Sequence, residues 1–404
     1  MARKPFSCGD RIPVPGSPSI VRTMKILIAN AIPYTSETPR IRRAPSIKDT
    51  MIYDLCLAFA DAGHDVTLFL CDRFRPLDPE TYPFRVVWAP CRWPGLFKPN
   101  VLPWCPSIGP LAERERFDLV IASEVFQLNS LALVRRCRGN LMVWQELAKH
   151  NRLFHEIPSR IWYGVVARLF FSRVPVVARS TQARSFISRY CKNVLDTVID
   201  HGVNLAKFEA CREKERYFVV CSQLIARKRI DRIIEKYHAF SQRHPDWELR
   251  IFGEGDREEE LRSQVAALGA ESQIKFFGKA DHRVLKEQLA KASAMLVYTE
   301  KDNNMVSIVE SIACGTPVVT TGVPYNAAYI RANALGIVDD SWDENDLEAI
   351  AARNSAYVAN CLAYRPALST ARKAETFVHL AREHLDWPRK DHYFHEDSRD
   401  RREH

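Results

Sequence analysis

Short apolar runs alternate with amphipathic segments along most of the chain. An apolar run at 24–30 is followed by a segment at 51–62 whose apolar positions recur at helical spacing, and then by a second apolar run at 65–70. Gly63 stands directly after the periodic segment, where a glycine is typical of a helix end. This succession predicts a β-α-β unit with a parallel, right-handed crossover.

The same alternation fills two halves of the chain. In the first half, further strands are predicted at 117–123, 140–146, 174–180 and 194–204, the last running into a turn. In the second half, strands are predicted at 217–224, 247–256, 274–281, 294–300 and 316–321, with helices at 230–245, 258–269 and 284–292. Strands and helices that alternate in this way predict an α/β fold with two Rossmann-like, doubly wound parallel sheets.

The domain organisation follows from changes in composition. The polar run at 209–216 separates the two halves, so we expect a first domain at 24–205 and a second at 206–365. Residues 1–23 are rich in Pro, Gly and Ser and are predicted to be a flexible extension. A helix at 366–387 is expected to cross back to the first domain, and 388–404 are predicted to be disordered.

The composition indicates the cellular compartment and the kinds of partner that suit the chain. The chain has 404 residues and 11 cysteines without a Cys-x-x-Cys pair, which argues against a disulfide framework and a zinc site. The start of the chain lacks the apolar core of a secretory signal, and the longest uncharged stretch, 311–330, is broken by glycine and proline. We therefore expect a cytoplasmic protein. The formal net charge of +9 suits nucleotides or anionic lipid surfaces, whereas no motif for reading nucleic acid is present.

Residues 302–317 carry the most specific pattern in the chain. They follow a predicted strand and lead into a helix, for which either Asn304 or Ser307 is the predicted N-cap. Ser307 and Glu310 have the spacing of a capping box. A helix N-terminus at the carboxyl end of a parallel strand presents free N–H groups and positive dipole character, so this turn is predicted to bind a diphosphate.

This pattern resembles the E-x7-E signature of the family 4 retaining glycosyltransferases, which have the GT-B fold: two Rossmann-like domains facing each other across a cleft. The two acids are Asp302 and Glu310, and a Gly-Thr-Pro-Val-Val run follows them. The resemblance implies that Glu310 binds the donor ribose hydroxyls and that Asp302, shorter than the family's glutamate, contacts the transferred sugar. It also implies that the donor is bound by the start of the helix, at Asn303, Asn304, Met305 and Val306. From the residues alone, Glu310 is alternatively a helix cap and Asp302 a loop acid.

Three further segments match the family, the third of them at residues 222–231, which are described next. Residues 199–204 resemble its interdomain segment, in which Gly202 suits a turn of positive φ. Gly253 and Gly255 resemble its G-x-G turn facing the donor.

Residues 222–231 resemble the family's G-R-L-x-x-x-K-G-x-D segment, whose arginine and lysine neutralise the departing diphosphate. Lys228 matches the lysine, whereas Gln223 stands in the place of the arginine. Arg227 or Arg229 is a candidate to supply the missing charge, and the alternative is a basic loop on a solvated face.

The first domain departs further from the family. Ser123 occupies the position where the family tends to have a histidine, so Glu124 beside it and His150 become candidates on the acceptor side. His150 is alternatively a structural histidine. The loop at 35–49 lacks the family's glycine pair and is basic, so it either binds a phosphorylated acceptor or lies in solvent; its arginines are Arg40, Arg42 and Arg43.

Residues 161–171 combine large apolar and aromatic side chains with arginines. Such a segment is either a buried helix of the first domain or an interfacial helix on anionic lipid, and the two are not exclusive.

The resemblance implies a retaining, metal-independent glycosyltransferase without a cofactor. Its donor would be a nucleotide sugar, UDP- or GDP-linked rather than ADP-linked, and its acceptor a saccharide or lipid-linked molecule in polysaccharide or glycolipid synthesis. Peripheral association with the inner face of the plasma membrane is an accompanying expectation. A degenerate GT-B protein that binds without turnover is the alternative. An NAD-type oxidoreductase is disfavoured because residues 24–37 contain no glycine.

Overall fold

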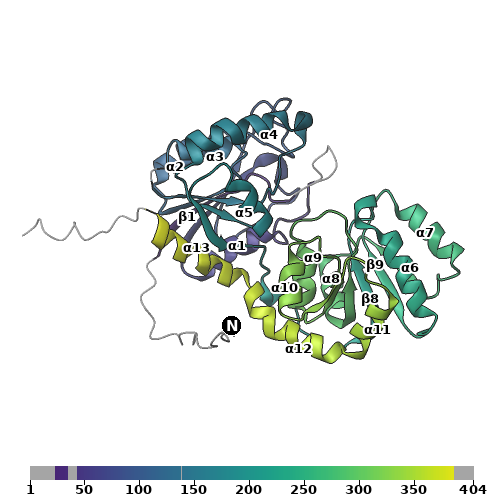
Figure 1. Ribbon diagram of the computed structural model, residues 1–404. Helices are drawn as coiled ribbons and strands as arrows, with labels where there is room; N and C mark the ends of the chain where they lie inside the picture. The colour runs from purple at the N-terminus through teal and green to yellow at the C-terminus, as the bar shows by residue number, and fades with distance from the viewer. Residues whose placement is uncertain (1–22, 35–42, 138, 386–404) are drawn as a thin grey trace, which may run out of the picture.

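The computed structural model describes residues 23–34, 43–137 and 139–385. Over these residues the chain forms two parallel β-sheets that lie side by side, each with helices on both of its faces (Figure 1). This arrangement confirms the α/β architecture predicted from the pattern.

The first sheet, over the described residues, has seven parallel strands in the order β3-β2-β1-β4-β5-β6-β7. They are β1 (Lys25–Ala29), β2 (Asp65–Cys71), β3 (Arg85–Ala89), β4 (Leu119–Ser123), β5 (Leu141–Gln145), β6 (Val176–Ala178) and β7 (Val194–Val198). Successive side chains point to opposite faces, so Ile26 and Ile28 pack in one core layer and Leu27 and Ala29 in the other. Because helices cover both faces of the sheet, both sides of each strand are apolar, and the strands appear in the sequence as continuous apolar runs.

The helices around this sheet are α1 (Met51–Asp61), α2 (Ile108–Glu115), α3 (Leu128–Val134), α4 (Ile157–Ile161), η3 (Trp162–Phe171) and α5 (Thr181–Ile187). Helix α1 begins where the Thr50 hydroxyl accepts a hydrogen bond from the Tyr53 N–H. Gly63, just beyond its end, has a φ of 84°, which a glycine adopts without strain. The η3 segment is a π-helix that continues directly from α4.

The second sheet has six parallel strands within the described ranges, in the order β10-β9-β8-β11-β12-β13. They are β8 (Glu215–Cys221), β9 (Glu248–Phe252), β10 (Ile274–Gly278), β11 (Ala292–Leu296), β12 (Val318–Thr320) and β13 (Gly336–Val338). Its helices are α6 (Ile230–Ser241), α7 (Glu258–Ala267), α8 (His282–Lys291), α9 (Val306–Ala313), α10 (Asn326–Ala332), α11 (Glu344–Ala352) and α12 (Asn354–Tyr364).

The chain passes between the two domains twice. The segment after β7 leads into the second domain, and helix α13 (Thr370–His384) returns to the first. The two crossings are joined because the Val203 N–H donates to Leu368 O (2.9 Å) and the Thr370 N–H donates to Val203 O (3.0 Å). Phe377 of α13 is fully buried in the first domain, with its ring 5.2 Å from that of Trp144. Figure 1 shows α13 lying along α1.

The sequence pattern missed strands β3 and β13. Strand β3 is an edge strand with mostly half-buried residues and prolines on either side, and β13 has three residues, so neither forms a clear apolar run. Strand β8 starts at Glu215, inside the polar run that was expected to be a linker. None of the helices in the described ranges has both the length and the apolar character needed to cross a bilayer.

Candidate active site

The carboxyl-terminal ends of central strands from both sheets meet between the domains. Asn303, in the loop after β11, donates from its Nδ2 to the backbone oxygen of Glu146, which directly follows β5 (3.2 Å). Open parallel sheets bind their ligands beyond the carboxyl ends of the strands. The residues at this meeting point therefore form the candidate site.

Asp302 holds two of the predicted cations in an ion-pair cluster. Its Oδ1 accepts a hydrogen bond from Arg227 Nη1 (2.8 Å), and its Oδ2 accepts from Lys228 Nζ (2.8 Å) and Thr299 Oγ1 (2.5 Å). Lys228 is buried, while Arg227 is partly exposed. Arg229 pairs with other acids outside this cluster. Of the two arginines left open by the sequence, Arg227 is thus the one beside Lys228.

This cluster lies beside the N-terminus of α9. Lys228 and Met305, which directly precedes the helix, line the same small cavity at the end of β8. Two cations and one carboxylate leave a net positive charge at this position. The charge adds to the positive dipole end of the helix, so the combination favours an anion such as a diphosphate.

The start of α9 differs from the prediction. The helix begins at Val306, and no described side chain caps it, so the predicted caps Asn304 and Ser307 are wrong. Instead, Asn326 of α10 accepts at its Oδ1 a hydrogen bond from the Met305 N–H (2.7 Å) and donates from its Nδ2 to Asn304 Oδ1 (2.7 Å). Because a neighbouring helix holds the turn, no local cap is needed, and the first helical N–H groups are available to a ligand.

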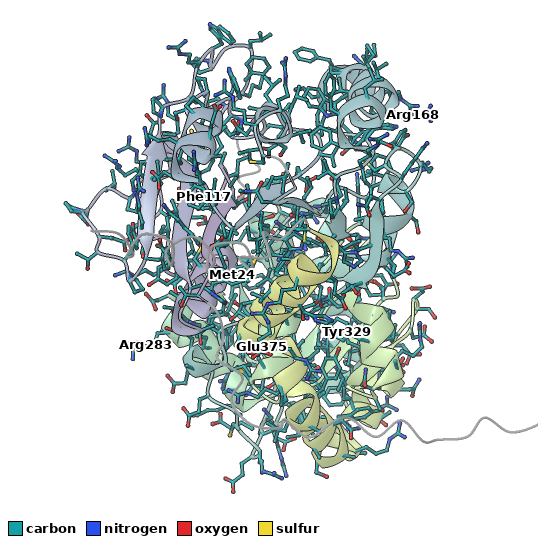
Figure 2. All side chains as sticks on the ribbon, turned by 90° about the vertical axis from the view of Figure 1, so that its left-hand side faces the viewer. Met24, Phe117, Arg168, Arg283, Tyr329 and Glu375 are labelled. Atoms are coloured by element: carbon teal, nitrogen blue, oxygen red, sulfur yellow. The ribbon has the colours of Figure 1, made fainter. Side chains whose placement is uncertain are left out.

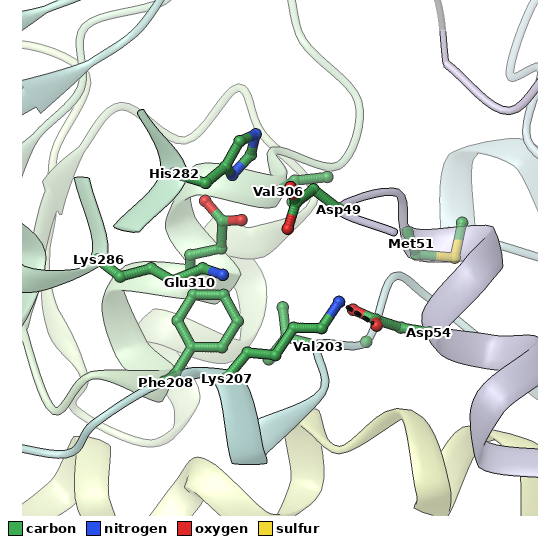
Figure 3. Close-up of a pocket in the computed structure, with 11 residues that line it drawn as sticks. Asp49, Met51, Asp54, Val203, Lys207, Phe208, His282, Lys286, Val306 and Glu310 are labelled. Carbon is green, nitrogen blue, oxygen red and sulfur yellow. Dashed lines mark ion pairs between the residues drawn. The ribbon is translucent and has the colours of Figure 1, made fainter. Parts of the chain in front are cut away.

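Glu310 lines a pocket between the two domains (Figure 3). Within the described residues its carboxylate makes no hydrogen bond or ion pair. Burial raises the pKa of Glu310 to about 7, opposed by Lys286 and assisted by Asp49 and Asp54. A half-buried carboxylate whose oxygens face a pocket, without a donor from the described residues, suits a ligand that carries hydroxyl groups.

Sequence reasoning missed the charged residues that surround Glu310 from other elements. Lys286 of α8 lies over the ring of Phe208, with its Nζ 4.9 Å from the ring centroid, and its ammonium points toward Glu310 in Figure 3. Lys207, in the first crossing, pairs with Asp54 of α1 across the domain boundary (2.6 Å). No local pattern marks these residues, because the pocket is assembled from helices distant in sequence.

Gly253 and Gly255 allow two loops at the end of the second sheet to approach closely. A Cβ on Gly253 would lie 1.8 Å from the backbone oxygen of Ser222, and one on Gly255 would lie 2.2 Å from that of Leu224. Both glycines are therefore required by backbone contact within the protein.

Gly202 lines the Glu310 pocket, but the prediction that it has a positive φ is wrong. A Cβ at this position would lie 3.1 Å from the backbone oxygen of Leu368 and 3.1 Å from the Thr370 nitrogen. The glycine is explained by the tight packing of the two crossings, which the local sequence does not reveal.

Glu124 is buried, and its carboxylate accepts hydrogen bonds from the backbone N–H groups of Glu146 (2.7 Å) and Leu147 (3.3 Å). Burial and the nearby Glu146 carboxylate raise the pKa of Glu124 to about 7. Burial also acts to raise the pKa of Glu146, yet Arg179 (2.9 Å) and His201 outweigh it and lower that pKa to about 2. The ionised acid at the carboxyl end of the first sheet is therefore Glu146. Its position as the last residue of a predicted strand was the available signal.

His150 is engaged inside the first domain. Its Nδ1 lies 3.2 Å from Ser159 Oγ, and its Nε2 lies 3.1 Å from the Tyr190 hydroxyl. The ring packs edge-on against Tyr163, and burial lowers its pKa. Both ring nitrogens have partners within the first domain, so the geometry agrees with the alternative of a structural histidine.

The remaining predicted positions are more peripheral. Arg43 is exposed, whereas Arg40 and Arg42 lie outside the described residues. Ser123 ends β4, and Gln223 is exposed in the loop after β8.

One group in the described part of the chain has atoms suited to a metal ion. Cys71 and Asp72 at the end of β2 and Cys91 just after β3 place two thiols and a carboxylate oxygen within 4.8 Å of one another. The spacing of cysteines in the sequence did not indicate this group, because two adjacent strands bring it together.

The comparisons with known proteins bear on the second domain most directly. Residues 204–353 match the model of the family described as Glycosyl transferases group 1. An uncharacterized glycosyltransferase of Haemophilus influenzae is 20% identical over 271 residues, which are 65% of this chain and 73% of that protein. An exopolysaccharide phosphotransferase of Streptomyces coelicolor is 29% identical over 136 residues, which are 33% of this chain and 14% of that protein.

Solved structures resemble most of the chain in fold. The structure of Anabaena HepE in complex with UDP has a TM-score of 0.65 at 14% identity, over 89% of this chain and 100% of that chain. WaaG, a glycosyltransferase involved in lipopolysaccharide biosynthesis, has a TM-score of 0.58 at 13% identity, over 88% and 99% of the two chains. The fold is GT-B. Asp302 and Glu310 both belong to the second GT-B domain, and Glu310 lines the interdomain pocket.

Proposed function

We propose that this chain is a retaining glycosyltransferase that moves a sugar from a nucleotide-sugar donor to a saccharide or lipid-linked acceptor. The observation that carries the proposal is Glu310, a half-buried carboxylate that lines the interdomain pocket of a GT-B fold and has no hydrogen-bond or ion-pair partner among the described residues. In the proposal, ribose hydroxyls donate to it. The similar Anabaena protein was crystallised with UDP and with UDP-glucose, which supports a uridine donor ahead of GDP and ADP.

The proposed chemistry relies on fixed positive charge. As the bond between the sugar and the diphosphate breaks, the developing negative charge lies near Lys228, Arg227 and the N-terminus of α9. Such preorganised groups are usually the largest catalytic contribution, and they remove the need for a metal ion. Asp302 is assigned as a positioning residue, because it bonds both cations in the structure.

In the proposed reaction the transferred sugar retains the configuration of the carbon that was bonded to the diphosphate. The acceptor oxygen attacks the sugar from the face that the diphosphate leaves, and its proton passes to a departing phosphate oxygen. No enzyme nucleophile is required. The first domain holds the acceptor in this scheme, and the names of the Streptomyces relative and of WaaG support surface polysaccharide or glycolipid synthesis as the context.

One observation favours the alternative of a GT-B protein that binds without turnover. Asp302 already neutralises one of the two cations, and Gln223 replaces the cation that the resemblance leads us to expect. A donor diphosphate would then meet less positive charge. Donor binding without transfer would be the result.

A thermal-shift panel tests the proposal. UDP, GDP, ADP and their sugars are added to wild type, to Glu310→Ala, and to Glu259→Ala as a matched control on the exposed face of α7. Ligand at about 100 times its Kd adds about 2.7 kcal/mol of stability. We expect uridine nucleotides to stabilise wild type and the control, and Glu310→Ala to lose the response.

A turnover assay then distinguishes the active transferase from a GT-B protein that binds its ligand without turnover. Release of UDP from UDP-sugars, with and without lipid or saccharide acceptors, supports the transferase. Stabilisation by UDP without release or transfer supports the binding protein. Absence of any nucleotide response in folded wild type contradicts both.

A further inference from the structure

Helices α4 and η3, together with Phe154 three residues before α4, expose a stripe of apolar side chains. Of thirteen large apolar side chains that are exposed in the described residues, six lie on this segment of seventeen residues. They are Phe154, Ile157, Ile161, Val165, Leu169 and Phe170, between 44% and 71% exposed. Such a concentration exceeds the scattered exposure expected of a soluble surface and indicates an interaction site.

The exposed apolar side chains recur at an interval that keeps them on one face of the helical segment. Ile157, Ile161, Val165 and Leu169 recur every fourth residue, and on the inner side Tyr163, Ala167 and Phe171 recur at the same interval and are fully buried. An interval of four is longer than the ~3.6-residue period of an α-helix, and it suits the wider turns of the π-helix η3. The segment thus has an apolar inner face in the core and a second apolar face outside. The sequence left a buried and an interfacial helix open, and the structure contains both faces.

The charges around the stripe are predominantly positive. Residues 151–173 contain four arginines and one acid, Glu156, so the segment carries a net charge of +3. The arginines are Arg152, Arg160, Arg168 and Arg173, all exposed. Arg168 lies over the ring of Tyr190 (5.9 Å), and Figure 2 shows it at the outer edge of the first domain. Apolar side chains flanked by arginines are typical of helices that lie in the interface of an anionic bilayer.

The stripe is near the candidate active site along the chain. Glu146, whose backbone oxygen accepts the hydrogen bond from Asn303 of the second domain, precedes Phe154 by eight residues. Eight residues span at most about 28 Å, so the stripe begins within that distance of the cleft. Between them, Lys149 has its pKa lowered by partial burial and by Lys301 of the second domain, which places this connection at the domain boundary.

We infer that this face binds the surface of an anionic lipid bilayer. The inference rests on the proposed function, for which it would bring lipid-linked acceptors to the first domain beside the cleft. A second copy of the chain is a poorer occupant, because a symmetric contact through the same face would oppose the two sets of arginines.

Vesicle flotation tests the inference. Wild type is mixed with vesicles of phosphatidylcholine alone, or of phosphatidylcholine and phosphatidylglycerol in equal parts. We expect binding to the anionic vesicles, weakened in about 1 M salt, where the Debye length falls to about 3 Å. The double variant I161E/L169E should bind at least about tenfold more weakly, because two side chains no longer enter the bilayer.

Two further variants make the test specific. R160Q/R168Q should reduce binding to anionic vesicles by about tenfold or more, since each arginine near the surface contributes to the attraction. L77E/L96E changes two equally exposed residues of the first domain outside the stripe and should bind as wild type does.

Absence of wild-type binding to anionic vesicles overturns the inference, as does equal binding by all variants. A dimer that I161E/L169E dissociates, seen by light scattering in a protein that does not bind vesicles, overturns it in favour of self-association. The UDP thermal shift of I161E/L169E is measured in parallel and should match wild type. In wild type, absent binding to anionic vesicles with an intact UDP response refutes the lipid surface alone, whereas vesicle binding without a UDP response refutes the proposed function alone.

Discussion

At the scale of single residues, the Glu310 carboxylate lines the pocket at a cost in folding stability when it is ionised. Its pKa is raised by burial from 4.5 to about 7, so the folded protein keeps a proton that the unfolded chain releases between those values. The stability that this proton provides is complete below about pH 4.5 and is lost as the pH rises through about 7. We predict that Glu310→Gln is more stable than wild type by about 1–2 kcal/mol at pH 8 and nearly as stable as wild type at about pH 4, below both pKa values. Denaturant unfolding at both pH values measures this, and equal stability at pH 8 would contradict the assignment of a raised pKa.

At the scale of elements, the N-terminus of α9 depends on α10. Asn326 is fully buried, and its amide group bonds the Met305 N–H, Asn304 Oδ1 and the Tyr329 hydroxyl. We predict that Asn326→Ala lowers the free energy of unfolding by about 2–3 kcal/mol, because buried polar groups lose their partners. It should also weaken the UDP thermal shift, since the turn before α9 is no longer held. Asn333→Ala, an exposed residue at the end of the same helix, is the control. If Asn326→Ala is destabilised but its UDP response is unchanged, the hydrogen bonds of Asn326 support the fold and do not contribute to ligand binding.

At the scale of the whole molecule, α13 ties the chain's end to the first domain. Phe377 packs in the core of that domain against Trp144 and Phe59, while the residues just before α13 bond to the first crossing. We predict that Phe377→Ala destabilises the protein by about 3–5 kcal/mol, as expected for a large buried ring that leaves a cavity. Glu375→Ala, exposed on the same helix, should change stability by less than about 0.5 kcal/mol. Chemical denaturation of both variants measures the difference, and similar values would show that α13 is not part of the first core.

The sequence by itself determined the alternation of strands and helices, the two sheets, and the place of Glu310 after a strand. These follow from apolar periodicity and from the rule that parallel strands end at one edge, both of which are local in the chain. The family resemblance also named Lys228 and Asp302 as site residues with separate roles, whereas the contact between them, more than seventy positions apart, appears only in the structure.

Only the tertiary structure decided which groups meet and which faces remain outside. Asn326 of α10 holds the turn before α9, Arg179 lowers the pKa of Glu146, and Lys286 faces Glu310, because elements distant in sequence pack together. The outer stripe of η3 has the same apolar character as its buried side, so composition could not show which side the core would cover. Burial and charge pairing are properties of the packed molecule, and residue order limits them without specifying them.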